Sequence, residues 1–258
     1  MPLDPAYETR LANHRAARLA ELAADDGWLN LTDRIELRQG QMAVGRAADN
    51  EIALSIGPSH LGQLTLTGDA ASLLTEAGET LALLPEGERP PRLRVAGMLL
   101  EIHSVDGRPA LRVRDLSPDR AVPNLRYFPT APAWCLRAEW RALDAPVTRK
   151  AEMVNGAYDA TVQTHFARFS HAGVSVDLVP LHVKAGQPMF VFRDQTAGHE
   201  TYGASRFLYG TDIADGGITL DFNTAFNPPC AFSDLAICPL PPRENILPFR
   251  VEAGELKP

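Results

Sequence analysis

The stretch RDQTAGHETYGASRFLYGTDIADGGITLDFNTAFNPPCAFSDLAICPLPPRENILP occupies residues 193–248. Its first half is rich in polar side chains, and its second half holds two of the three cysteines and six prolines. Within it, residues 218–223 (ITLDFN) alternate apolar and polar side chains, the period-two pattern of a β-strand. We expect the fold and any functional site to be organised around this stretch.

Short apolar runs bounded by turn residues predict strands along most of the remaining chain. In the N-terminal half they lie at 34–37, 41–44, 51–54, 62–66, 72–75, 81–84, 92–95, 98–103 and 110–113. In the C-terminal half they lie at 134–141, 147–154, 158–169, 174–183, 189–193, 204–208, 218–222 and 248–251. Many short strands at near-regular spacing are typical of antiparallel sandwiches and barrels. The predicted fold is all-β, mainly antiparallel, with a C-terminal barrel or sandwich; a calycin-like barrel would hold a ligand-sized interior.

One long helical pattern opens the chain. Asp4 is a suitable N-cap, Pro5 suits the first helical position, and Gly27 suits the C-terminal end. We expect this helix to pack on a smaller β region, with several charged side chains facing solvent: Arg10, Arg15, Arg18 and Glu21. The predicted domains are the helix at 1–27, the smaller β region at 28–120 and the C-terminal β domain at 121–258.

Composition excludes several classes of protein. The 258 residues are 45% hydrophobic and 22% charged, with a formal net charge of −7, as in an ordinary globular protein. A negative net charge does not attract nucleic acid or an anionic membrane. The start, MPLDPAYETR, lacks the apolar run typical of a secretion signal, and no apolar run is long enough to span a bilayer. We therefore expect a cytoplasmic protein with neither nucleic-acid nor membrane partners, and the composition leaves its oligomeric state open.

The three cysteines do not form a disulfide framework, because they are few and odd in number. Cys230 and Cys238 enclose a short loop, for which three interpretations remain: close but reduced thiols, which we favour, a disulfide, or half of a metal site. Cys135 lies in the alternating run 134–141, on the face opposite Trp134 and Trp140.

Polar residues in and near the C-terminal stretch form the candidate site. Asp221 and Asn223 share one strand face, about 7 Å apart by strand geometry. A buried carboxylate needs a partner, and Arg206 is the expected one. We assign catalytic roles to Asp221, Glu200 and Tyr202, and ligand-binding roles to Arg114, Arg206, Asn223, Asn227 and Asp194.

No cofactor or metal is expected. The chain has no phosphate-binding loop, dinucleotide fingerprint or nucleophile elbow, and its seven histidines lack chelating spacing. Gly45-Arg46, followed by Asn50, resembles the opening of forkhead-associated phosphothreonine-binding domains. The adjacent Ser59-His60 departs from that family's wider Ser and His spacing.

A second resemblance is longer. The segments RDQTAGHETYGASRFL (193–208) and LDFNTAFNPPCAFSDLAICPLPPRENILP (220–248) resemble the signature of a bacterial and archaeal family known as domain of unknown function 1684. LRVRDLSP (111–118) and YFPTAPAW (127–134) also fit it. The resemblance spans roughly residues 25–253 and departs at His199, where the family more often has Lys. It implies relatives without implying an activity.

Three functions follow as hypotheses. The first is the binding of a small polar or anionic molecule inside or at the mouth of the C-terminal β domain. The second is a hydrolase or isomerase that uses a buried carboxylate with Arg206 and Tyr202. The third is phosphopeptide binding through Gly45-Arg46.

Overall fold

The computed structural model describes residues 4–105, 107–117, 123–156, 158–184 and 186–258. The chain forms two compact units. The N-terminal unit is Glu21–Val122, and the C-terminal unit combines Met1–Ala20 with Pro123–Pro258. The fold is mainly antiparallel β with one N-terminal helix, as the sequence predicts.

The N-terminal unit is a nine-stranded sheet in the order β1-β9-β8-β7-β6-β5-β4-β2-β3. Its strands are antiparallel neighbours except for the parallel pair β2 and β3. Their bounds are Leu31–Glu36, Gly40–Gly45, Ile52–Ala53, Gly62–Thr67, Ala70–Thr75, Thr80–Glu86, Arg89–Val95, Met98–Val105 and Arg108–Asp115 for β1 to β9. Each predicted run in this half overlaps one of these strands. Alternating residues such as Leu64, Leu73 and Leu111 are fully buried and form one apolar core.

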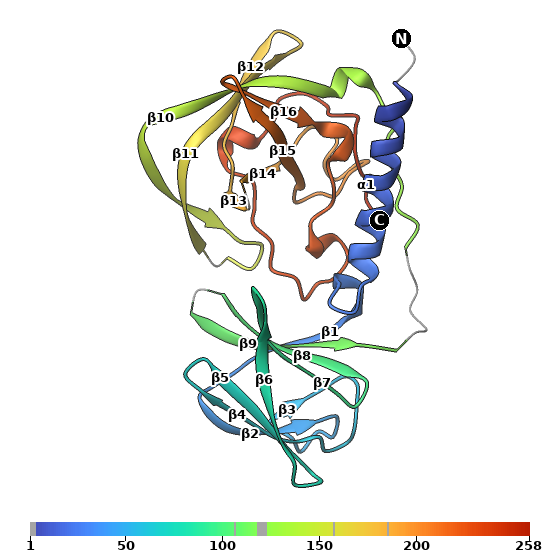
Figure 1. Cartoon of the computed structure of the whole chain (residues 1–258), viewed down its shortest axis with the longest axis vertical. Coiled ribbons are helices and arrows are strands. Elements are labelled where there is room, and N and C mark those ends of the chain that lie inside the picture. Colours follow the sequence, from blue (N-terminus) through green and yellow to red (C-terminus); the bar gives the residue numbers. More distant parts are fainter. Residues whose placement is uncertain (1–3, 106, 118–122, 157, 185) are drawn as a thin grey trace. The chain divides into compact units, whose positions relative to one another are not determined.

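The C-terminal unit is a seven-stranded sheet in the order β12-β11-β10-β16-β15-β14-β13. Strands β10 to β16 are Cys135–Glu152, Tyr158–His171, Val174–Leu178, His182–Lys184, Gln187–Phe192, Arg206–Ala214 and Gly217–Asp221. The sheet curls, and β10 and β11 form a long, bent pair (Figure 1). A single curled sheet around one core favours the open-barrel alternative over two stacked sheets.

The interior of the C-terminal sheet is filled by side chains. Phe190, Phe192 and Phe222 are fully buried there, and Phe192 and Phe222 meet edge to face with ring centroids 5.3 Å apart. Trp134 and Trp140 pack against the same core from the alternating run that the sequence identified. The ligand-sized interior expected for a calycin-like barrel is therefore occupied by aromatic rings.

The predicted strands differ from the observed ones in three places. The runs 134–141 and 147–154 form one continuous strand, β10. The run 174–183 divides into β12 and β13 at Pro180, which lacks the backbone N–H that a ladder needs. Residues 248–251 are not a strand. There the Val251 N–H donates to Asp194 (2.5 Å) and its carbonyl accepts from Arg206 (2.9 Å), so side chains take the place of a partner strand.

Helix α1 spans Pro5–Ala23, and its residues up to Ala20 belong to the C-terminal unit. The expectation that the helix packs on the smaller β region is wrong for this part. Arg18, expected to face solvent, is 7% exposed and donates to the carbonyl of Asn227 (2.9 Å). Short 3-10 turns complete the fold at Trp28–Asn30, Pro132–Trp134, Phe222–Thr224, Pro229–Ala231 and Arg243–Asn245. No helix within the described residues is long and apolar enough to cross a membrane.

Candidate functional site

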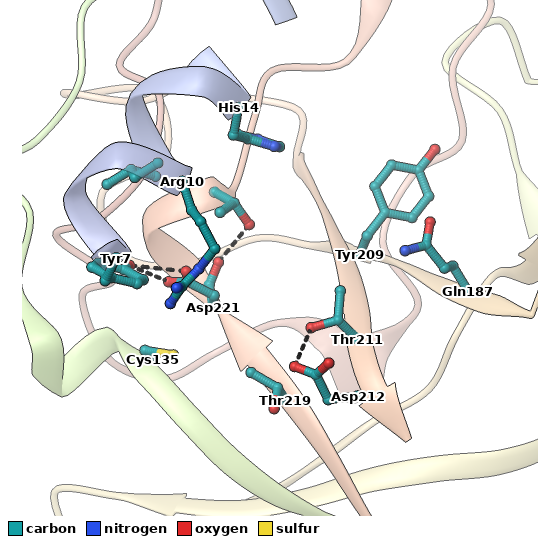
Figure 2. Close-up of a pocket in the computed structure, with 12 residues that line it drawn as sticks. Tyr7, Arg10, His14, Cys135, Gln187, Tyr209, Thr211, Asp212, Thr219 and Asp221 are labelled. Atoms are coloured by element: carbon teal, nitrogen blue, oxygen red, sulfur yellow. Dashed lines mark hydrogen bonds between the residues drawn. The ribbon is translucent and has the colours of Figure 1, made fainter. Parts of the chain in front are cut away.

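A pocket of about 370 Å³ lies between helix α1 and the outer face of the C-terminal sheet (Figure 2). Four helix residues spaced at i, i+3, i+4 and i+7 line one wall, because such residues share a helix face: Tyr7, Arg10, Leu11 and His14. Outward-facing residues of β10, β15 and β16 form the opposite wall: Cys135, Tyr209, Thr211, Thr219 and Asp221. In this sheet Cys135 is the cross-strand neighbour of Asp221, and Thr211 that of Thr219.

Asp221 is the most tightly held group in this pocket. The Tyr7 hydroxyl lies 3.0 Å and 2.9 Å from its two carboxylate oxygens. The backbone N–H and side-chain Nδ2 of Asn223 donate to Asp221 Oδ1 at 3.1 Å and 3.0 Å. Burial and the Asp221 carboxylate raise the pKa of Tyr7 above its usual value, so Tyr7 stays protonated and donates. Asp221 Oδ2 keeps acceptor capacity toward the pocket.

Arg10 is the free cation of the pocket. Its guanidinium lies 5.7 Å from the centroid of the Tyr7 ring, and among the described residues it has no ion-pair or hydrogen-bond partner. Cys135 beside it is a neutral thiol, because burial and the charge of Asp221 raise its pKa, although Arg10 opposes this shift. Among the described residues, the pocket thus offers the unpaired cation of Arg10, the held carboxylate of Asp221, a second carboxylate from Asp212 and several hydroxyl groups.

Arg206 does not pair with Asp221, contrary to the sequence-based expectation. Arg206 lies on the inner face of β15, with its guanidinium 5.0 Å from the centroid of the Phe192 ring, whereas Asp221 lies on the outer face of β16. The partner of Arg206 is Asp194, 3.3 Å away, with both side chains 1% exposed. These two predicted ligand-binding residues hold the interior of the sheet and do not line the pocket.

The other predicted residues of this unit also serve packing contacts. Tyr202 donates to the carbonyl of Cys230 (2.9 Å), and Glu200 pairs with Arg250 (2.6 Å) at the surface. Asn227 is fully buried, and its backbone N–H and side-chain Nδ2 donate to the C-terminal segment. Asn223 exchanges two 3.0 Å hydrogen bonds with the backbone of Ala131. The structure therefore brings Asp221 and Asn223 together and leaves Glu200, Tyr202 and Asn227 outside the pocket lining.

Arg114 belongs to the N-terminal unit. Its side chain is 4% exposed, lies 3.3 Å from Glu101 and donates to the carbonyl of Gly27. Arg92 and Arg112 pair with the same carboxylate, at 2.5 Å and 3.6 Å. Arg114 is thus one of three guanidinium groups that share a single glutamate, apart from the candidate site.

The Gly45-Arg46 loop has a packing reason for its glycine. A Cβ at Gly45 would lie 2.4 Å from the carbonyl oxygen of Ser59 and 2.8 Å from the Cα of His60. Only glycine permits this close approach of two backbones. Arg46 itself is exposed, and phosphopeptide binding through it stays a prediction.

The three cysteines are free thiols, and the backbone N–H of Cys230 donates to Cys238 Sγ at 3.2 Å. The structure agrees with the favoured interpretation of close, unbonded thiols. Within the described part of the chain, no group of three His, Cys, Asp or Glu residues has the geometry of a metal site. The hydrogen bond with the Cys238 thiol, aided by the Tyr202 hydroxyl, lowers the pKa of Cys230 to about 7.

We expect iodoacetamide to alkylate Cys230 with a rate that rises through pH 7, where about half of the thiol is ionised. Cys135 should need a pH above the ordinary thiol range of about 8.5, since its pKa is raised. Peptide-level mass spectrometry of samples quenched between pH 5 and 10 measures both rates. In the control variant Tyr202→Phe, the midpoint for Cys230 should move upward. A midpoint near 8.5 in the unaltered protein would contradict the lowered pKa.

The fold and site define a curled-sheet β protein with a polar pocket under an N-terminal helix. The chain belongs to the family described as protein of unknown function (DUF1684), whose match covers residues 121–256. This match starts at residue 121, whereas the resemblance noted in the sequence was expected from about residue 25. The chain is also similar to an uncharacterised protein of Haloarcula marismortui solved by solution NMR. The two are 32% identical over 51% of this chain and 75% of that one, with a TM-score of 0.43. Comparison with curated proteins gave no significant match.

Sequence reasoning missed the helix wall of the pocket. Tyr7 and Leu11 were expected to share a helix face, but Arg10 was expected only to face solvent. The available signal was the spacing of Tyr7, Arg10 and His14, which places two cationic or titratable groups beside an aromatic hydroxyl. The sequence does not show which face of the sheet this helix covers. The spacing of Tyr7, Arg10 and His14 therefore does not identify the strand residues that lie opposite them.

Proposed function

We propose that the C-terminal unit binds a small polar anion in the pocket under helix α1. The observation that supports this proposal is the guanidinium of Arg10, which lines the pocket without an ion-pair partner among the described residues. Guanidinium groups bind carboxylates and phosphates through paired N–H donors. His14, one helical turn further on, lines the same wall and adds an imidazole ring.

The acceptor groups of the pocket favour an anion that also carries a hydroxyl or amino group. Among the described residues, Asp221 Oδ2 accepts a hydrogen bond from Tyr7 alone, so a ligand N–H or O–H group has an acceptor there. The Asp221 carboxylate also disfavours a ligand with negative charge over its whole surface. The ligand class that fits is a small hydroxy or amino acid, or a small phosphate ester with free hydroxyl groups.

Catalysis by Asp221 is the second candidate, and the contacts of this residue weigh against it. A general base needs a free oxygen at the proton that it removes, and in Asp221 only Oδ2 keeps acceptor capacity. Asp221 Oδ1 already accepts two hydrogen bonds from Asn223, and both oxygens contact the Tyr7 hydroxyl. Glu200 and Tyr202 are outside the pocket lining. These contacts support a positioning role for Asp221 in a binding site.

Removing the cation should abolish most of the binding. We expect Arg10→Ala to weaken the affinity for responsive anions at least tenfold, the loss expected for one charge-assisted hydrogen bond of about 1.5–3 kcal/mol. Isothermal titration with citrate, inorganic phosphate, glutamate and glycerol 3-phosphate measures this change. The affinity should also fall between 50 and 300 mM NaCl, because the contact is electrostatic.

The matched control is Arg15→Ala, on the same helix. Arg15 donates to Thr130 (3.2 Å) and stacks over Tyr127, so it is already engaged, and its loss should leave the affinity unchanged. Asp221→Asn separates binding from catalysis: lost turnover with retained affinity would favour an enzyme. Equal affinities of the Arg10→Ala and Arg15→Ala variants would refute the proposal.

A further inference from the structure

Cys230 and Cys238 form a pair of adjacent thiols in the segment that follows β16. The backbone N–H of Cys230 donates to Cys238 Sγ at 3.2 Å, and the two thiols also share a hydrogen bond with each other. Neither cysteine lines the pocket under helix α1. Whatever chemistry this pair carries out is therefore separate from the anion binding proposed for that pocket.

The backbone is held in place at both cysteines. Cys230 lies in the 3-10 turn Pro229–Ala231, directly after two prolines whose rings restrict the chain. The carbonyl of Cys238 accepts a hydrogen bond from the N–H of Val154 (2.8 Å), which ties this cysteine to the chain just beyond the end of β10. Because both backbones are fixed, the two thiols stay within hydrogen-bonding distance of each other.

The two thiols differ in their access to solvent. Cys230 is partly exposed, whereas Cys238 is only 2% exposed. A dissolved oxidant therefore reaches Cys230 first, and Cys238 is placed to react with its neighbour. The thiolate is the reactive form of cysteine. The hydrogen bond with the Cys238 thiol, aided by Tyr202 and opposed by burial, lowers the pKa of Cys230 to about 7, so this form is populated at neutral pH.

We infer that Cys230 and Cys238 are a redox site that reduces a small hydroperoxide and closes to a disulfide. First the Cys230 thiolate attacks a peroxide oxygen: an S–O bond forms, the O–O bond breaks, and the leaving oxygen takes up a proton. Then the Cys238 sulfur, after losing its proton, attacks the sulfenic acid of Cys230: the S–S bond forms, the S–O bond breaks, and water leaves. The two sulfurs lose two electrons, which the peroxide gains, and a dithiol reductant restores the pair.

Hydrogen peroxide is the probe, applied at pH 7 to the reduced full chain. The intact mass should fall by two hydrogen atoms. Cleavage of the denatured product before Asp234, which lies between the two cysteines, should leave the fragments joined until dithiothreitol is added. Alkylation of the remaining thiols measures the rates. Cys230 should react at least about fivefold faster than Cys135, because its larger thiolate fraction outweighs the lower nucleophilicity of a thiol with a lower pKa.

Two matched variants assign the roles of the thiols. Cys238→Ser should leave a sulfenic acid at Cys230 that dimedone traps, because no second thiol removes it. In Cys230→Ser, the buried Cys238 should stay reduced at the same peroxide concentration. Equal trapping in the unaltered protein and in Cys238→Ser would overturn the inference. Oxidation of Cys135 before Cys230, or a disulfide between two chains in place of one within the chain, would also overturn it. These last two outcomes are read from the unaltered protein, so they stand even if a variant does not fold.

Discussion

Replacing Arg206 with methionine is expected to lower the free energy of unfolding of the C-terminal unit by about 3–5 kcal/mol. Arg206 is 1% exposed, and its guanidinium donates to the carbonyls of Ala253 and Val251 and pairs with Asp194. Methionine has a similar length, so the core volume is largely kept. The loss comes from Asp194, which would remain buried without its cation, and from two carbonyls without a donor.

Tryptophan fluorescence during denaturation by urea measures this loss. Trp134 and Trp140 pack against the core of the C-terminal unit, and Trp28 lies in the N-terminal unit. In a Trp28→Phe background the signal therefore reports the C-terminal unit. Adding Asp194→Asn to Arg206→Met removes the uncompensated charge and should restore part of the stability. The exposed pair of Arg250 and Glu200 supplies the control, because Arg250→Met should leave the midpoint almost unchanged. An equally small change for Arg206→Met would show that the buried pair contributes little.

Alternation of apolar and polar residues predicted most strands because one face of each sheet is buried. It failed at residues 248–251, where Val251 is apolar and buried but its backbone bonds Asp194 and Arg206. A single apolar pattern fits both a strand and an extended segment held by side chains. The difference depends on Arg206, which is 45 residues away from Val251 along the chain. Sequence pattern alone carries no information on such a long-range contact.

The candidate site was predicted only in part, because it too depends on contacts between residues that are far apart in the sequence. Asp221 was found because it alternates with the core residues Ile218, Leu220 and Phe222, which indicates the outer strand face. Its partner was predicted wrongly. A buried carboxylate needs a cation nearby, but this requirement does not tell on which face of the sheet that cation lies. Arg206 lies two residues before the core residue Leu208 on β15, so both side chains point to the inner face of the sheet. Comparing the alternation of inward and outward residues on β15 with that on β16 would have placed Arg206 and Asp221 on opposite faces.

A second large effect is expected in the N-terminal unit, where Glu101→Gln should lower the free energy of unfolding by about 3–5 kcal/mol. Glu101 is 3% exposed, and its carboxylate lies within 3.6 Å of the guanidinium groups of Arg92, Arg112 and Arg114. Burial first, and then the nearby Arg112, lower the pKa of His103 to about 4, although the charge of Glu101 opposes this shift. Without the carboxylate, three buried cations would lose their shared anion.

Hydrogen–deuterium exchange with mass spectrometry localises this effect, because peptides from β8 and β9 report the N-terminal unit separately. Their exchange should accelerate in Glu101→Gln, while peptides from β14 to β16 exchange as before. Glu51→Gln is the matched control: Glu51 pairs with Arg38 at 2.5 Å in solvent, and its exchange pattern should not change. Adding Arg112→Met to Glu101→Gln removes one uncompensated cation, so part of the protection should return. If the double variant exchanges faster than Glu101→Gln, the packing of Arg112 over the Trp28 ring, and not charge balance, stabilises this face.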